Sequence, residues 1–187
     1  MIYVKFIFIF KHKHSASLTH MKKAVLILII SVLMVNLTYG QTDWITYKID
    51  NKLSIKLPAQ PNAIDERTNK VMDKDNNVYL VAVIDLTEAA GIDSAQLAAY
   101  APKPEFANGI KNGMLKKVPG LSLGDVKVDK WNGYYCYHIE GGNVEKKLKL
   151  FTYEIIIGSK MYGFTAMIHE DKNISSKDDF FNSLVLN

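Results

Sequence analysis

Hydrophobic and polar residues alternate along much of the chain, beginning with the stretch WITYKIDNKLSIKLPAQPN at residues 44–62. An alternation with a period of two is typical of β-strands that bury one face. The polar pair Asp50-Asn51 interrupts this alternation and predicts a tight turn between two short strands. Pro58 and Pro61 are expected to end the second strand, because proline donates no hydrogen bond to a neighbouring strand.

The same alternation predicts further strands at residues 68–72, 78–86, 121–130, 134–140, 147–157 and 160–168. Polar or glycine-containing turns are expected between them, at residues 73–77, 131–133, 141–143 and 158–159. In the last hairpin a two-residue Gly158-Ser159 loop pairs apolar residues, such as Ile155 with Tyr162. A slip of one residue would break these pairs, so the register is well specified. The opposite face of this hairpin is also largely apolar, which predicts layers on both faces of the sheet.

Residues 91–120 have a helical pattern between the strand segments. Ser94 is expected to cap a short helix that runs to Tyr100, and Pro104 suits the first turn of a second helix. Pro119-Gly120 ends that helix. Its apolar residues recur every four positions and form an amphipathic stripe, namely Phe106, Ile110, Met114 and Val118. Such a stripe either packs against a core, the interpretation we favour, or lines a ligand pocket.

The chain ends in a predicted short helix that carries Phe180, Phe181 and Leu184. Ser176, with Asp179 three residues later, resembles a capping box. The complete pattern predicts an α+β fold in which an antiparallel β-sheet is flanked by helices. Neither a linker nor an internal repeat interrupts residues 41–187, so we expect a single domain there.

The N-terminal region has the pattern of a secretory signal peptide at residues 21–40. Lys22 and Lys23 precede an almost unbroken apolar run, and small residues lead to an expected cleavage site at Gly40-Gln41. The apolar run is shorter than the roughly 18–20 residues of a membrane-spanning helix. Residues 1–20 do not fit a signal peptide, and they indicate an upstream mis-start or a leader extension. We therefore expect an exported protein, periplasmic or secreted, that meets the membrane only through this segment if it stays uncleaved.

The charge of the domain differs from that of the whole chain. The chain carries a formal net charge of +4, but 18 of its 23 basic residues and all 19 acidic residues follow residue 40. The domain is therefore nearly neutral. Nucleic-acid binding requires a basic face, so we expect no nucleic-acid partner.

The order of the elements resembles the Mog1/PsbP-like α/β/α sandwich superfamily over nearly all of residues 43–187. The resemblance depends on the opening W..Y.......I.LPAQPN, the strand YGFTA and the closing SSKDDFFNSLVL. It implies a non-catalytic binding or assembly module. It carries over no functional residue.

Reactive side chains are few after residue 40. Cys136, His138 and Glu140 alternate along one predicted strand, so their side chains lie on one face. Cysteine, histidine and carboxylate side chains can bind a transition metal, and a Cys–His pair can also form a nucleophile. The simpler alternative is a buried cysteine beside two polar residues near the end of a strand, and we expect no cofactor.

Aromatic residues gather near the turn at residues 131–133, as Trp131, Tyr134, Tyr135 and Tyr137. Because neighbouring residues of a strand point to opposite faces, some of these rings are expected to face outward and to bind a protein partner or a sugar. The alternative is a strand packed on both sides. The sequence thus predicts an exported, non-catalytic binding or assembly module whose partner is another protein. The second hypothesis is a small-ligand or metal-binding protein.

Overall fold

The structure is a computed structural model that describes residues 44–187. The predicted leader, signal peptide and cleavage site lie outside the described residues. Within residues 44–187, eight strands form one antiparallel sheet, here called the main sheet. They are β3 (Asn62–Ala63), β4 (Thr68–Met72), β5 (Val78–Asp85), β6 (Ser122–Leu123), β7 (Lys127–Trp131), β8 (Tyr134–Asn143), β9 (Leu148–Ile157) and β10 (Lys160–His169). Their order is β3-β4-β5-β10-β9-β8-β6, and β7 also pairs with β8.

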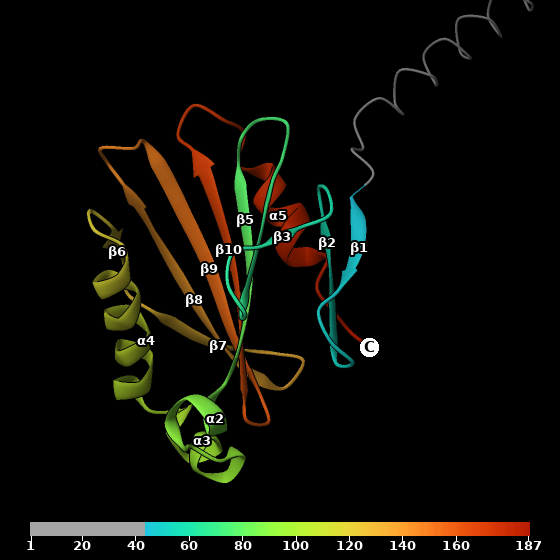
Figure 1. The fold of residues 1–187 in the computed structure, drawn as a ribbon. Helices are drawn as coiled ribbons and strands as arrows, with labels where there is room; N and C mark the ends of the chain where they lie inside the picture. Colours follow the sequence, from blue (N-terminus) through green and yellow to red (C-terminus); the bar gives the residue numbers. More distant parts are fainter. Residues whose placement is uncertain (1–43) are drawn as a thin grey trace, which may run out of the picture. The chain divides into compact units, whose positions relative to one another are not determined.

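Four helices and a small second sheet complete the described part of the chain. The helices are α2 (Leu86–Ala90), α3 (Ser94–Tyr100), α4 (Pro104–Lys117) and α5 (Ser175–Asn182). The small sheet has the order β1-β2-β11 and consists of β1 (Ile45–Lys48), β2 (Leu53–Leu57) and β11 (Val185–Leu186). Figure 1 shows α4 on one side of the main sheet, and α5 with β1 and β2 on the other side. The predicted α+β fold is confirmed, although the α5 layer also contains the small sheet.

The face of the main sheet that meets α5, here called the α5 face, is filled by aromatic residues. Phe180 of α5 is fully buried, and its ring centroid lies 5.1 Å from that of Tyr79 and 5.1 Å from that of Phe181. Phe181 stacks on Tyr153 at 4.0 Å. Trp44 contacts Tyr79 edge-on at 5.1 Å, which ties the start of the domain into the same core. Aromatic contacts of this kind add stability beyond the burial of their area.

The predicted register of the last hairpin is confirmed. Ile155 pairs with Tyr162 around the Gly158-Ser159 loop, and both side chains are buried on the α5 face. On the opposite face, the same register places Glu154 directly across from Gly163.

The predicted turn at residues 141–143 is wrong, because β8 continues to Asn143. Gly141 pairs with β6 and β9, and Gly142 pairs with both strands as well. A Cβ atom on Gly141 would lie 2.2 Å from the carbonyl oxygen of Ser122. These glycines therefore permit close approach of neighbouring backbones inside the sheet.

Four other details differ from the sequence pattern. The strand expected at residues 121–130 is divided into β6 and β7, and the strand expected to reach Leu86 ends at Asp85, where α2 begins. Asp93 caps α3 in place of Ser94, through a capping box with Gln96. The capping box expected at Ser176 does not form, because α5 begins at Ser175 without a side-chain cap bond.

Candidate functional site

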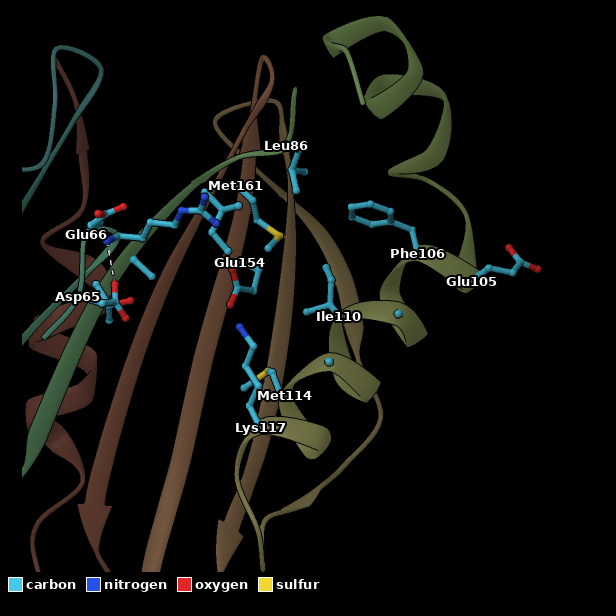
Figure 2. Close-up of a pocket in the computed structure, with 16 residues that line it drawn as sticks. Asp65, Glu66, Leu86, Glu105, Phe106, Ile110, Met114, Lys117, Glu154 and Met161 are labelled. Atoms are coloured by element: carbon cyan, nitrogen blue, oxygen red, sulfur yellow. Dashed lines mark hydrogen bonds between the residues drawn. The ribbon is translucent and has the colours of Figure 1, made fainter. Parts of the chain in front are cut away.

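A cavity of about 850 Å³ lies between α4 and the main sheet. Most of its wall is apolar, and the side chains come from α4, from the start of α2 and from the strands and loop that face them. The principal apolar residues are Ile84, Leu86, Phe106, Ile110, Met114 and Met161. Figure 2 shows the α4 residues Phe106, Ile110 and Met114 pointing toward the sheet. Phe106, Ile110 and Met114 of the predicted stripe therefore line a cavity, the alternative that the sequence left open. Phe106 and Ile110 also pack against a buried cluster, as the favoured interpretation predicted, whereas Val118 is exposed.

The cavity exists because small residues occupy its floor. Across the main sheet, Ala82 pairs with Gly163, and Gly163 pairs with Glu154. Neither Ala82 nor Gly163 has a side chain long enough to reach α4. Gly163 also makes room for its neighbour, because a Cβ atom there would lie 2.9 Å from one Glu154 carboxylate oxygen. The backbone pairing thus places the Glu154 carboxyl next to Gly163, and Gly163 next to Ala82. Neither small residue fills the space below α4.

Glu154 is the polar group at the base of this cavity. Burial raises the pKa of its carboxyl to about 7, and no hydrogen bond or charge within residues 44–187 offsets the effect. A carboxyl group without a donor is costly to ionise in such surroundings. Glu154 therefore exchanges a proton near neutral pH and has room beside it for a donor.

Other charged residues lie around the wall. Lys117 and Arg67 are basic, and Asp65, Glu66 and Glu105 are acidic. In Figure 2, Lys117 extends from the last turn of α4 into the cavity, whereas Glu105 points away from it. The cavity thus combines an apolar wall with a few polar groups, which is the usual composition of a small-molecule site.

The three predicted metal ligands differ in their burial and in their contacts. Cys136 is fully buried on the α5 face, and burial raises the pKa of its thiol to about 12. The His138 ring packs against Tyr153 at 4.1 Å, and burial lowers its pKa. Glu140 is exposed. Across residues 44–187, no three His, Cys, Asp or Glu side chains are grouped closely enough to hold a metal ion.

The predicted aromatic residues are divided between the two faces of the main sheet. Trp131 and Tyr134 pack against the core of the α5 face. Tyr135 and Tyr137 belong to the face that meets α4. Tyr137 is fully buried, and its hydroxyl donates a hydrogen bond of 2.6 Å to the Ala101 carbonyl. These four rings therefore do not form one patch.

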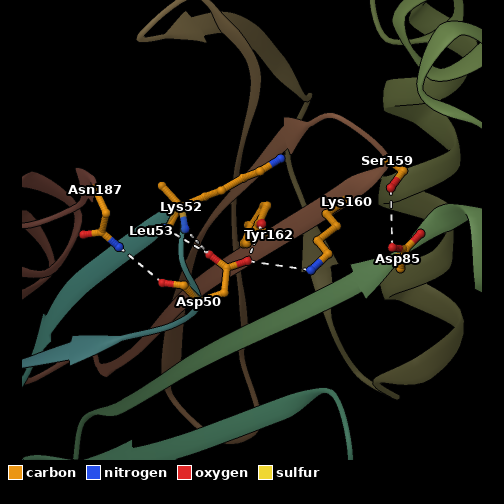
Figure 3. Close-up of polar contacts among 8 residues, drawn as sticks. All are labelled: Asp50, Lys52, Leu53, Asp85, Ser159, Lys160, Tyr162 and Asn187. Carbon is orange, nitrogen blue, oxygen red and sulfur yellow. Dashed lines mark hydrogen bonds and ion pairs between the residues drawn. The ribbon is translucent and has the colours of Figure 1, made fainter.

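A second half-buried carboxyl, Asp50, has the opposite environment to Glu154. Figure 3 shows the Tyr162 hydroxyl and the Lys52 and Leu53 amides donating to Asp50, with Lys160 also facing it. Partial burial opposes ionisation, but these hydrogen bonds and the Lys160 charge outweigh it and lower the pKa of Asp50. Asp50 thus ties the β1–β2 turn to β10 and has its donors supplied by the protein.

The described domain has the PsbP-like fold. It is similar to the solution structure of cyanobacterial PsbP (CyanoP) from Synechocystis sp., with a TM-score of 0.52 and 13% identity, over 80% of this chain and 96% of that chain. This likeness confirms the fold that the sequence resemblance implied. At this identity it establishes the fold alone.

Two other solved structures are less similar. A crystal structure from Bacteroides thetaiotaomicron has a TM-score of 0.36 and 9% identity, over 72% of this chain and 45% of that chain. A protein of unknown function from Pseudomonas aeruginosa has a TM-score of 0.37 and 13% identity, over 67% and 83% of the two chains. No family model and no curated protein sequence matches the chain. None of the helices in residues 44–187 is long and apolar enough to cross a membrane.

Sequence reasoning missed Glu154 as a site residue. It recognised that the second face of the last hairpin is apolar, but it did not consider the one carboxylate there. A signal did exist, because the predicted register puts Glu154 opposite a glycine. A charged residue beside the smallest residue, on a face expected to be covered, indicates a cavity.

Proposed function

We propose that residues 44–187 form a non-catalytic binding module that holds a small, largely apolar molecule between α4 and the main sheet. The observation that carries this proposal is the cavity of about 850 Å³ under the apolar stripe of α4. Cavities that bind drug-sized molecules measure roughly 300–1,000 Å³ and are mostly apolar. Because residues 21–40 have the pattern of a signal peptide, we also propose that binding takes place outside the cytoplasm.

The protonation of Cys136 supports binding over catalysis by a cysteine nucleophile. Nucleophilic cysteines act as thiolates, and their pKa values are lowered by nearby positive charge. Cys136 has the reverse environment, since burial, Asp129 and Glu154 raise its pKa to about 12. Its sulfur thus stays a buried thiol at neutral pH.

The small molecule is preferred over the protein partner that the aromatic residues suggested. A docking surface needs its rings on one side, whereas Trp131 and Tyr137 pack on opposite faces of the main sheet. The cavity, by contrast, gathers its apolar side chains around one space. Docking of another protein at Trp131 and Tyr134 stays a separate prediction.

The test is a titration of the protein with N-phenyl-1-naphthylamine, a neutral apolar dye that fluoresces when it leaves water. We expect saturable binding with one dye per chain. Ala82→Leu should weaken it, because the larger side chain enters the floor of the cavity. Ala89→Leu, on the exposed side of α2, is the matched control and should bind as the original chain does.

Two results would overturn the proposal. One is the absence of saturable binding by the folded protein. The other is equal binding by the Ala82→Leu and original proteins, both with cooperative thermal unfolding, because the dye would then lie elsewhere.

A further inference from the structure

Among the carboxyl groups of residues 44–187 that line the cavity, Glu154 is the one that lies on a strand of the main sheet. Its strand neighbours on the same face are Tyr137 and Gly163. The Tyr137 hydroxyl already donates to Ala101, and Gly163 has no side chain. The protein therefore supplies the Glu154 carboxylate with no donor from either neighbouring strand.

The space in front of Glu154 is the apolar cavity itself. A carboxylate facing such a space is stabilised most by a group that brings both a positive charge and a hydrogen bond. Asp50 illustrates the alternative within the same chain, because Tyr162 donates to it at 2.6 Å and Lys160 lies 3.8 Å away. At Glu154 the corresponding donor has to come from outside the main sheet.

We propose that the cavity selects an amphiphilic amine, with its ammonium group on the Glu154 carboxylate and its apolar body under Phe106, Ile110 and Met114. This inference rests on the proposed binding function and adds the chemical class of the ligand. The apolar body follows from the α4 stripe, and the ammonium group follows from the unpaired carboxylate. A ligand carboxylate would repel Glu154 and would have to bind at the basic side chains instead.

The charged groups around Glu154 determine what competes with the amine. From α4, Lys117 extends into the cavity, whereas Glu105 points away from it. Asp65, Glu66 and Arg67 line the side formed by the start of β4 and the loop before it. From β8, Tyr137 is neutral and its hydroxyl is already bonded. No ion pair within 4.0 Å joins Lys117 or Arg67 to Glu154 among residues 44–187. Both basic side chains line the cavity, so both can compete with the ligand ammonium.

The interaction makes binding depend on pH. The unliganded Glu154 carboxyl has a pKa raised to about 7, and only its ionised form pairs with an ammonium group. Octylamine stays protonated from pH 5 to 8. Its apparent affinity should therefore be full near pH 8 and fall by up to about tenfold for each unit below pH 7.

The experiment compares three ligands with the same eight-carbon tail, each displacing N-phenyl-1-naphthylamine from the full domain. At pH 8 octylamine should bind roughly tenfold or more tightly than 1-octanol, because a hydrogen bond to a charged group is stronger than a neutral one. Octanoate should bind most weakly. Glu154→Gln should abolish the preference for the amine and its pH dependence, while octanol binding is kept.

Two further variants separate Glu154 from general effects of charge. Glu88→Gln removes an exposed carboxylate from α2, outside the cavity, and should keep the amine preference. Lys117→Met removes the competing ammonium group and should leave octylamine binding unchanged or tighter.

Each other outcome has a definite meaning. Tightest binding of octanoate, lost in Lys117→Met, would overturn the inference and assign the polar end to the basic side chains. Equal binding of octylamine and octanol would also overturn it, while the proposed binding function would stand. A folded protein that binds neither the dye nor octanol would overturn the proposed function itself.

Discussion

The α5 face and the face that meets α4 are built on the same strands, but the α5 face carries the larger buried cluster. Phe180, Phe181 and Tyr153 interlock there, and fully buried side chains come from both sheets. Over the other face, α4 has one buried residue, Ala107. Phe106 and Ile110 of α4 pack against a smaller buried cluster there and also border the cavity. The α5 face thus supplies most of the packed core, whereas the other face leaves the space in which we propose that a ligand binds.

Two half-buried carboxyl groups show the same difference in electrostatic terms. Asp50, beside β10, receives donors from Tyr162 and two backbone amides, and its pKa is lowered. Glu154 receives none from residues 44–187, and its pKa is raised. This unpaired carboxylate is the reason that we propose a ligand ammonium group at Glu154 and not at Asp50.

The largest expected effect contrasts the two apolar layers. Phe180→Ala should lower the free energy of unfolding by about 3–5 kcal/mol, because it opens a hole among four aromatic rings. Met114→Ala should cost about 1 kcal/mol or less, since its side chain is half-buried beside an existing cavity. Urea denaturation of both variants measures the two values. Similar losses would mean that α4 is packed as tightly as α5.

The next effect concerns Glu154 and pH. Its carboxyl binds a proton more tightly in the folded than in the unfolded protein, with a pKa raised from 4.5 to about 7. Stability from this group is therefore complete below about pH 4.5 and falls as the pH rises through 7. Glu154→Gln should raise the free energy of unfolding by about 2 kcal/mol at pH 8, after allowance for water in the cavity, and change it little at pH 4.5.

Asp50→Asn is the contrasting variant, and thermal unfolding of both variants between pH 3 and pH 8 measures the two effects. Because the pKa of Asp50 is lowered from 3.8, its stabilising contribution is present above that pH and is lost on acidification. The variant should thus be less stable than the original chain at pH 7, with a difference that shrinks toward pH 3. If both variants changed stability in the same direction at pH 8, the two carboxyl environments would not be opposite.

The smallest effect tests how open the α4 layer is. Gly109→Ala should raise the free energy of unfolding by about 0.5–1 kcal/mol, because alanine favours a helix interior over glycine. A Cβ atom at this position meets nothing within 4 Å, so no clash opposes the gain. Chemical denaturation is the measurement. A loss of stability would show that another part of the protein covers Gly109.

The sequence predicted the elements whose signals are local. The hairpin at Gly158-Ser159 has a register that only one pairing satisfies, and the helix that begins at Pro104 has a proline suited to its first turn. The turn predicted at residues 141–143 is wrong, although glycine was used there as the same kind of local signal. Glycine marks a turn in most sequences, but inside a sheet it also permits two strands to approach closely, and only the pairing with β6 and β9 distinguishes these roles.

The alternation and the aromatic residues by themselves determined an antiparallel sheet with covered faces and a domain that closes with Phe180 and Phe181. Only the tertiary structure decided what each face contains. The α4 stripe has the same pattern whether it meets a core or a cavity, because amphipathic spacing records which side turns inward and not how much space lies there. The cavity depends on Ala82 and Gly163 lying side by side across β5 and β10. These residues are far apart in the chain, so their joint effect on Glu154 exists only in the folded sheet.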